Sequence, residues 1–243
     1  MQFPSVSLII PCYNEESRIP LMVLGVQEFA AQWKGDFEVI IVDDGSSDQT
    51  YLRLKQEPLI LSLSSSNQLT ILQQKNQGKG AALQLGMVEA KKDFVLTLDA
   101  DMATSPVEII QWLTMKKAFN THEIWIGSRE MNRAQVKDHW HRELAGHVFN
   151  LILRTITGLK IKDTQCGFKL YPSALGKIIF KSLQTPGWAH DVEILKRAEK
   201  KGIGIIEMPI HWEAVEGSKI NLLKDSFKMF VEVCKISMMK MDA

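Results

Sequence analysis

Two aspartates at the end of an apolar segment give the sequence its clearest chemical signal. Asp99 and Asp101 follow the run FVLTL and are separated by the small Ala100. Residues two apart on an extended segment point the same way, so the carboxylates converge, which is unfavourable without a cation or a proton. Mg²⁺ or Mn²⁺ bridging a diphosphate meets that need, because hard cations take oxygen ligands from protein and phosphate together. The alternative is that both aspartates cap or stabilise a loop, since D-x-D is a weak motif by itself.

A second acidic pair follows the apolar run FEVIIV. Asp43 and Asp44 precede Gly45, which permits a tight turn, and Ser47 and Asp48 can cap the next helix. One hypothesis is that Asp43 hydrogen-bonds a nucleotide base or its ribose. The alternative is a capped turn, which explains Ser47 and Asp48 but gives Asp43 no role.

Two further clusters offer groups that suit a nucleotide. Pro11, Tyr13 and Glu15 follow the first apolar run, and the tyrosine ring can stack on a planar base. Lys79 stands between two glycines in NQGKGAAL, directly before a helical pattern, where backbone amides and an ammonium can approach a nucleotide. Neither GxxxxGK[ST] nor GxGxxG is present, so the P-loop and dinucleotide-binding folds lose support.

The elements that must position these clusters alternate along the chain. Apolar runs predict strands at 6–11, 37–42, 69–73, 94–98 and 124–126, and 3.6-residue periodicity predicts helices at 18–33, 79–91 and 105–118. This alternation predicts a parallel α/β sheet with right-handed crossovers. Ligands of such sheets bind at the carboxyl ends of the strands, which is where the polar clusters fall.

The second half of the chain is less regular. We expect helices at 142–157, 192–201 and 219–241, and a strand at 203–212. The predicted organisation is one catalytic domain over 1–218 and a C-terminal amphipathic helix within 219–243. One face of that helix is apolar, and it either lies on a membrane surface or packs on its own domain; its members are Leu223, Phe227, Phe230, Val231, Cys234 and Met238.

Composition restricts the class of protein. The 243 residues are 45% apolar and 23% charged, which is ordinary for a globular domain with a full core. Twenty-nine basic side chains oppose 28 acidic ones, whereas a dedicated nucleic-acid-binding protein is usually more basic. Three widely spaced cysteines and an N-terminus without a signal-peptide pattern favour reduced thiols. We therefore expect a cytoplasmic protein, free or peripheral on the cytoplasmic face of a membrane.

Taken together, the four clusters resemble the inverting glycosyltransferases of family 2, which have the GT-A fold. In the second half, IGSRE (126–130), KDTQCGFKLY (162–171), GWAHDVEIL (187–195) and EMPIHWEAVEGSKI (207–220) are similar to the dolichyl-phosphate β-glucosyltransferase branch. The dolichyl- and polyprenyl-phosphate mannose synthases are a close second. The resemblance implies a mostly parallel, Rossmann-like central sheet flanked by helices.

The resemblance also implies roles for the four clusters. The uracil or the ribose of the donor is held by Pro11, Tyr13, Glu15 and Asp43. Lys79 lies near the base. Asp101 is the direct ligand of Mg²⁺ or Mn²⁺, and Asp99 binds that metal, a water on it, or the ribose.

For the second half, the resemblance implies contacts with phosphate and sugar. The residues that meet phosphate are Arg129, Arg133, Arg142 and Lys219, with Ser218 beside the last. Gln165 and the backbone around Gly167 line the sugar pocket, and Asp191 faces the sugar or the acceptor. The catalytic residues implied are therefore Asp191, Lys219 and Arg129.

The implied reaction moves glucose from UDP-glucose to a dolichyl or polyprenyl phosphate. The lipid phosphate attacks the anomeric carbon, and UDP leaves from the opposite face with inversion. A phosphate monoester is already anionic at neutral pH, so a strong general base is unnecessary. Asp191 is either such a base or a hydrogen-bond acceptor for a sugar hydroxyl.

Other functions remain open from the residues alone. The same fold can transfer mannose from GDP-mannose, or use another acceptor, because a few pocket side chains decide such choices. A sugar nucleotidylyltransferase needs a glycine-rich basic loop after the first strand, where this chain has PCYN. A nucleotide-sugar-binding protein without turnover is the remaining class.

Overall fold

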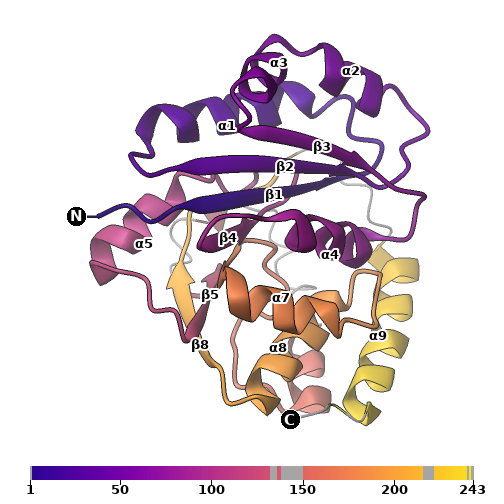
Figure 1. Ribbon diagram of the computed structural model, residues 1–243. Coiled ribbons are helices and arrows are strands. Elements are labelled where there is room, and N and C mark those ends of the chain that lie inside the picture. Colours follow the sequence, from indigo (N-terminus) through magenta and orange to yellow (C-terminus); the bar gives the residue numbers. More distant parts are fainter. Residues whose placement is uncertain (1, 132–135, 138–149, 216–221, 240, 242–243) are drawn as a thin grey trace.

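The computed structural model describes residues 2–131, 136–137, 150–215, 222–239 and 241 (Figure 1). Within these residues, one seven-stranded sheet has the order β3-β2-β1-β4-β7-β5-β8. Its strands are β1 Val6–Cys12, β2 Phe37–Asp43, β3 Leu69–Gln73, β4 Phe94–Thr97, β5 Glu123–Ser128, β7 Lys169–Pro172 and β8 Gly204–Pro209. A two-stranded ribbon pairs β6 Val136–Lys137 with β9 Trp212–Glu213.

The sheet is mostly parallel, as the sequence predicts. Strands β1 to β4 run parallel to one another, and β5 runs parallel to β8. Strand β7 runs antiparallel to both of its neighbours, β4 and β5. It was not predicted, because its four residues include a lysine that interrupts the apolar pattern.

Helices cover both faces of this sheet (Figure 1). Those described are α1 Ile19–Gln32, α2 Thr50–Gln56, α3 Pro58–Ser65, α4 Lys79–Glu89, α5 Glu108–Lys116, α7 Ser173–Lys181, α8 His190–Lys200 and α9 Leu222–Met238. Residues 150–157 are also helical. Helices α3 and α7 were not predicted, since each has nine residues or fewer and too few turns for a clear period. Helix α2 begins at Thr50, where the sequence indicates a helix after the turn at Gly45.

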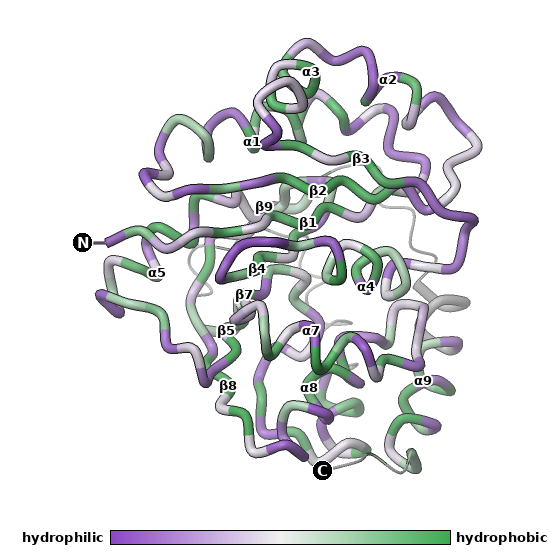
Figure 2. Tube along the Cα trace, in the orientation of Figure 1, coloured by the Kyte–Doolittle hydropathy of each residue, from purple (hydrophilic) through white to green (hydrophobic). Residues whose placement is uncertain are grey.

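The alternation of side chains along β1 divides the core into two layers. Leu8 and Ile10 pack on the side of α1 and α5, while Ile9 packs on the side of α4 and α7. Figure 2 shows hydrophobic residues along the central strands of the sheet. The sheet therefore forms a rigid base, and its strand ends can carry polar side chains at fixed positions.

The strand predicted at 203–212 is divided in the structure. Strand β8 ends at Pro209, and β9 begins at Trp212. Proline has no N–H for a ladder hydrogen bond, so it favours the end of a strand. The Pro209 carbonyl instead accepts a 2.9 Å hydrogen bond from the indole nitrogen of Trp112 in α5.

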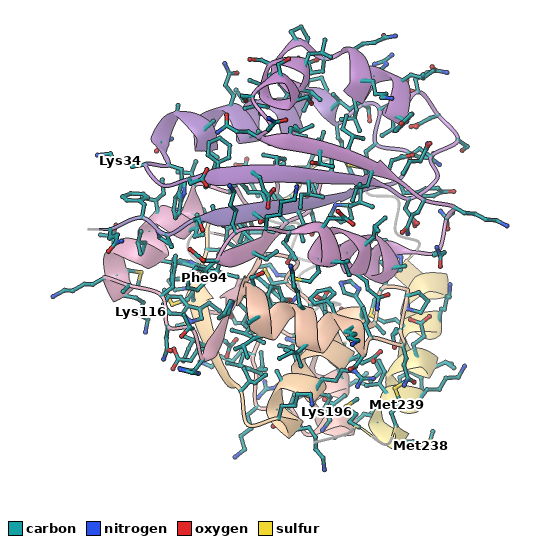
Figure 3. The ribbon with its side chains drawn as sticks, viewed as in Figure 1. Lys34, Phe94, Lys116, Lys196, Met238 and Met239 are labelled. Atoms are coloured by element: carbon teal, nitrogen blue, oxygen red, sulfur yellow. The ribbon has the colours of Figure 1, made fainter. Side chains whose placement is uncertain are left out.

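The C-terminal helix α9 has two apolar sides. Val233 and Ile236 are buried in the core layer that includes α8. The predicted apolar face lies elsewhere on the helix: Phe230 and Val231 are exposed, and Met238, labelled in Figure 3, is 75% exposed. The helix therefore packs on the domain through Val233 and Ile236, and these three residues of the predicted apolar face are exposed. None of the described helices combines the length and apolar character needed to cross a bilayer.

Candidate active site

A cavity of about 510 Å³ opens at the carboxyl ends of β1, β2 and β4. The predicted site residues that line it come from three of the four clusters, the D-x-D segment among them: Pro11, Tyr13, Glu15, Lys79, Asp99 and Asp101. The far wall is formed by 186–188 and by two α9 residues, Lys228 and Glu232. The cavity therefore joins segments from both halves of the chain.

The turn after β4 brings the two aspartates together. Met102 has a positive φ of 53°, and its N–H donates to the Asp99 carbonyl at 3.1 Å. The Ala103 N–H donates to Asp101 Oδ1 at 3.1 Å. Burial and the neighbouring Asp99 charge raise the pKa of Asp101 above its ordinary value. A carboxylate whose charge is disfavoured by a neighbouring aspartate is part of a donor set that suits Mg²⁺ or Mn²⁺.

The backbone at Gly167 forms the wall behind Asp99. A Cβ atom added to Gly167 would lie 2.6 Å from Asp99 Oδ2, so a side chain here would push the Asp99 carboxylate out of its position. The Thr97 hydroxyl donates to the Gly167 carbonyl at 3.0 Å and holds this wall against β4. Gly167 was predicted to line the sugar pocket, and the structure places it against the predicted metal-binding carboxylate.

Lys79 is ion-paired with Asp99 inside the cavity. Its ammonium also lies 5.4 Å from the centre of the Trp188 ring, a cation–π contact. Burial disfavours the ammonium, but the charges of Asp99, Asp191 and Asp101 outweigh it and raise the pKa of Lys79 to about 12. The lysine is therefore a permanent positive charge in this cavity near neutral pH.

Asp44 fixes the loop that carries Lys79, and sequence reasoning missed it. Its carboxylate accepts hydrogen bonds from the N–H groups of Gln77 at 2.9 Å and Gly78 at 2.7 Å. Gly78 has φ of 107°, and a Cβ there would lie 2.6 Å from the Pro186 carbonyl. The loop is consequently held between the end of β2 and the segment 185–188.

Asp43 occupies a different environment from Asp44. It is fully buried and does not line the cavity. Its carboxylate accepts from Gln73 Nε2 at 3.0 Å and from the Ser46 N–H at 3.4 Å. The capped turn is also present, since Asp48 Oδ1 accepts from the Thr50 N–H at 2.9 Å. Contact between Asp43 and a base or ribose stays a prediction.

The cluster after β1 presents an aromatic ring and an ion pair. Tyr13 is 44% exposed on the cavity. Arg18, a cavity residue that the sequence did not indicate, donates to Glu15 at 3.0 and 3.3 Å. Asn14, with φ of 55°, anchors the loop by accepting from the Ser47 N–H at 2.7 Å. The ring and the carboxylate are thus held on one side of the cavity.

Asp191 lies in the first turn of α8 and is buried in an ion pair. Lys169, fully buried on β7, donates to Asp191 and to the Cys166 carbonyl. His190 Nε2 lies 3.4 Å from the same Asp191 oxygen. Burial disfavours the carboxylate, but His190, Lys169 and Lys79 together lower the pKa of Asp191 below its ordinary value. The group is a weak proton acceptor and does not line the cavity.

Arg129 makes a two-pronged ion pair with the buried Asp163. The guanidinium donates at 2.8 and 3.0 Å, and the Arg129 N–H adds a third bond at 3.1 Å. Burial opposes the Asp163 charge, but the Arg129 charge and hydrogen bonds lower the pKa of Asp163. The arginine also lies over the Trp212 ring at 5.5 Å. A phosphate contact by Arg129 remains a prediction.

Five further predicted residues cannot be assigned to the cavity from the described part of the chain. The Gln165 side-chain amide lies 2.6 Å from the sulfur of Met229 in α9 and does not line the cavity. Four predicted residues lie outside the described part of the chain: Arg133, Arg142, Ser218 and Lys219. The roles given to these five residues stay predictions.

Comparisons with known proteins place the chain in a family. The model of glycosyl transferase family 2 matches residues 7–178. A dolichyl-phosphate β-glucosyltransferase of Dictyostelium discoideum is 33% identical over 95% of this chain and 73% of its own length. The Saccharomyces cerevisiae enzyme of that name is 34% identical over 96% and 74%, and the human one 32% over 88% and 69%.

Solved structures agree on the fold. Glucosyl-3-phosphoglycerate synthase of Mycobacterium tuberculosis, in complex with Mn²⁺, UDP and glucosyl-3-phosphoglycerate, superposes with a TM-score of 0.66 at 16% identity. The match covers 96% of this chain and 80% of that one. The seven-stranded mixed sheet, the matched family model and these relatives together show that the chain belongs to glycosyl transferase family 2, with a GT-A fold, and is a glycosyltransferase.

Proposed function

We propose that this glycosyltransferase moves glucose from UDP-glucose to a dolichyl or related polyprenyl phosphate, with inversion at the anomeric carbon. The observation that carries the proposal is the pair Asp99 and Asp101, converging in a cavity with Lys79. The relatives named dolichyl-phosphate β-glucosyltransferase support the sugar and the acceptor. The solved complexes of a neighbour with UDP-glucose and Mn²⁺ support the donor and the metal.

The donor half of the reaction follows from the cavity residues. Tyr13 offers a ring face to the uracil, and Asp44 holds the loop that brings Lys79 to the diphosphate. Asp101 and Asp99 would hold Mg²⁺ or Mn²⁺, which neutralises charge on the leaving diphosphate when bound. The Lys79 ammonium would stabilise the negative charge that develops on UDP as it leaves.

The acceptor needs little activation. Its phosphate is already anionic at neutral pH, so alignment matters more than proton removal. Asp191, held ionised by Lys169, suits a structural or hydrogen-bonding role better than that of a base. Asp191→Asn should therefore keep activity within about tenfold of wild type, whereas loss of a general base typically costs 10²–10⁴-fold.

A lipid acceptor requires the enzyme to work at a membrane surface, and α9 supports such a surface. Lys228 and Glu232 of α9 line the cavity, while Phe230, Val231 and Met238 are exposed on the same helix. An amphipathic helix with this arrangement suits the bilayer interface. The free thiols of all three cysteines fit the reducing cytoplasmic side. We therefore propose peripheral attachment on the cytoplasmic face.

The deciding experiment is transfer from radiolabelled nucleotide sugars to a short polyprenyl phosphate, with Mg²⁺ or Mn²⁺. We expect label from UDP-glucose in the lipid phase, and a loss of at least about 10²-fold in Asp101→Asn. Transfer from GDP-mannose alone would replace this function by that of a mannose synthase. Binding of UDP without transfer to any lipid phosphate would point to another acceptor or to a binding protein.

A test of the membrane proposal uses vesicle sedimentation. Phe230→Ser with Val231→Ser should weaken binding to vesicles, because it removes exposed apolar surface without touching the buried face of α9. The control is Leu52→Ser, which removes an exposed leucine on α2 that does not line the cavity. Equal binding by the two variants would contradict attachment through α9.

A further inference from the structure

The ion pair between Lys79 and Asp99 occupies a carboxylate that the proposed function assigns to a divalent cation. Lys79 is 15% exposed and Asp99 is 42% exposed, so the pair lies at the inner wall of an open cavity. Arg18, which also lines the cavity, pairs instead with Glu15. Lys79 thus differs from Arg18 in placing its charge directly on the D-x-D segment.

The position of the Lys79 ammonium is built from several sides. Asp44 holds the preceding backbone through the N–H of Gly78. The Gly80 N–H donates to the Pro186 carbonyl at 2.8 Å and fixes the first turn of α4. Trp188 lies beside the ammonium, whose distance to the ring centre is 5.4 Å. Such a set of contacts points to a defined role for the charge, beyond that of a solvated surface lysine.

An ammonium and a divalent cation compete for one carboxylate. Both take its lone pairs, and their positive charges repel each other at short distance in a partly buried cavity. We propose that Lys79 is an internal counter-ion that occupies Asp99 in the empty site and weakens metal binding until a nucleoside diphosphate arrives. This inference rests on the proposed use of a divalent cation.

The nucleoside diphosphate resolves the competition. Its oxygens supply new partners for the ammonium and, at the same time, further ligands for the metal. The flexible four-carbon stem lets the Lys79 ammonium move from Asp99 to the diphosphate while its backbone stays fixed. The metal and the nucleotide are therefore taken up together, with Lys79 making the metal-only state unfavourable.

The test measures Mn²⁺ affinity of the full chain from the electron paramagnetic resonance signal of free Mn²⁺, without any turnover. Lys79→Met should lower the dissociation constant for Mn²⁺ about tenfold in the absence of nucleotide, because a repelling charge is removed. Lys75→Met is the matched control, since Lys75 is exposed on the same loop and does not line the cavity. With UDP present, the gain in Lys79→Met should disappear.

A second pair of variants assigns the effect to Asp99. In the Asp99→Asn background, Lys79→Met should bring no further gain in Mn²⁺ affinity. The proposal is overturned if Lys79→Met binds Mn²⁺ no tighter than wild type, or gains equally without Asp99. Absence of Mn²⁺ binding in wild type with UDP present would overturn the metal requirement of the proposed function as well. Thermal unfolding checks the fold, and Lys79→Gln serves if Lys79→Met is unstable.

Discussion

Replacing only one partner of the buried ion pair between Lys169 and Asp191 should strongly destabilise the folded protein. Lys169 is fully buried, and Asp191 is 5% exposed. Lys169→Met keeps the length and volume of the side chain but leaves the Asp191 carboxylate without its main partner. Removing one member of a buried pair typically costs about 3–5 kcal/mol, because the other charge stays buried.

The expected shift in melting temperature follows from the size of the chain. A change of 1 kcal/mol moves the Tm of a 150–250-residue domain by about 2–4 °C, so Lys169→Met should lower Tm by roughly 6–20 °C. His190, 3.4 Å from Asp191, can recover part of this loss by taking a proton. Burial lowers the pKa of His190, so that proton is itself costly near neutral pH.

The assay is urea denaturation followed by far-UV circular dichroism at pH 7, with Tm as a second readout. The double variant Lys169→Met with Asp191→Asn removes both charges and should be more stable than Lys169→Met alone. As a control, Lys92→Met breaks the exposed pair with Asp36 and should cost about 0–1 kcal/mol. A cost for Lys169→Met no larger than this control, or no recovery in the double variant, would refute the reasoning.

Three further changes have distinct expected outcomes. Gly167→Ala places a Cβ 2.6 Å from Asp99 Oδ2 and should displace this carboxylate. Because a displacement of about 1 Å can cost about 10²-fold in rate, kcat/KM for sugar transfer should fall about 10- to 100-fold. A rate near wild type would show that Asp99 tolerates the displacement. Asp44→Ala leaves two partly buried N–H donors unpaired and should cost about 1–3 kcal/mol in urea denaturation, and a smaller loss would mean that the loop finds other partners. Asp163 has a lowered pKa in the folded chain because of Arg129, so its contribution is complete above its unfolded pKa of about 3.9 and is lost as the pH falls through the folded value. The difference in unfolding free energy between wild type and Asp163→Asn should therefore be large at pH 6 and shrink below about pH 4, and a constant difference would contradict the linkage.

The positions of the donor-site clusters could be predicted because they depend on regular elements. Parallel strands bring their carboxyl ends to one edge, so the residues after β1 and β4 had to meet. The choice between Asp43 and Asp44 could not be made in this way. Successive side chains leave a strand end on opposite sides, and the turn at Gly45 decides which one reaches the cavity.

The second half was harder to predict because its contacts join distant segments. Lys169 and Asp191 are 22 residues apart and lie on a strand and a helix that meet only in the folded sheet. A buried lysine also breaks the apolar pattern by which a strand is recognised. The side of α9 that packs on the domain was missed because the buried Val233 and Ile236 share the helix with the apolar residues Phe230, Val231 and Met238, which are exposed.

The antiparallel strand β7 has a consequence for synthesis of the protein on the ribosome. Strands β3, β2, β1 and β4 are complete once residue 97 has emerged, but the neighbour of β4 is β7, which ends at Pro172. Until then β4 is an edge strand of the nascent chain, and residues that are buried in the folded protein are exposed along that edge. Co-translational folding therefore has to shield that edge for at least the time needed to add the next 70 or so residues, roughly 4–15 s at typical elongation rates.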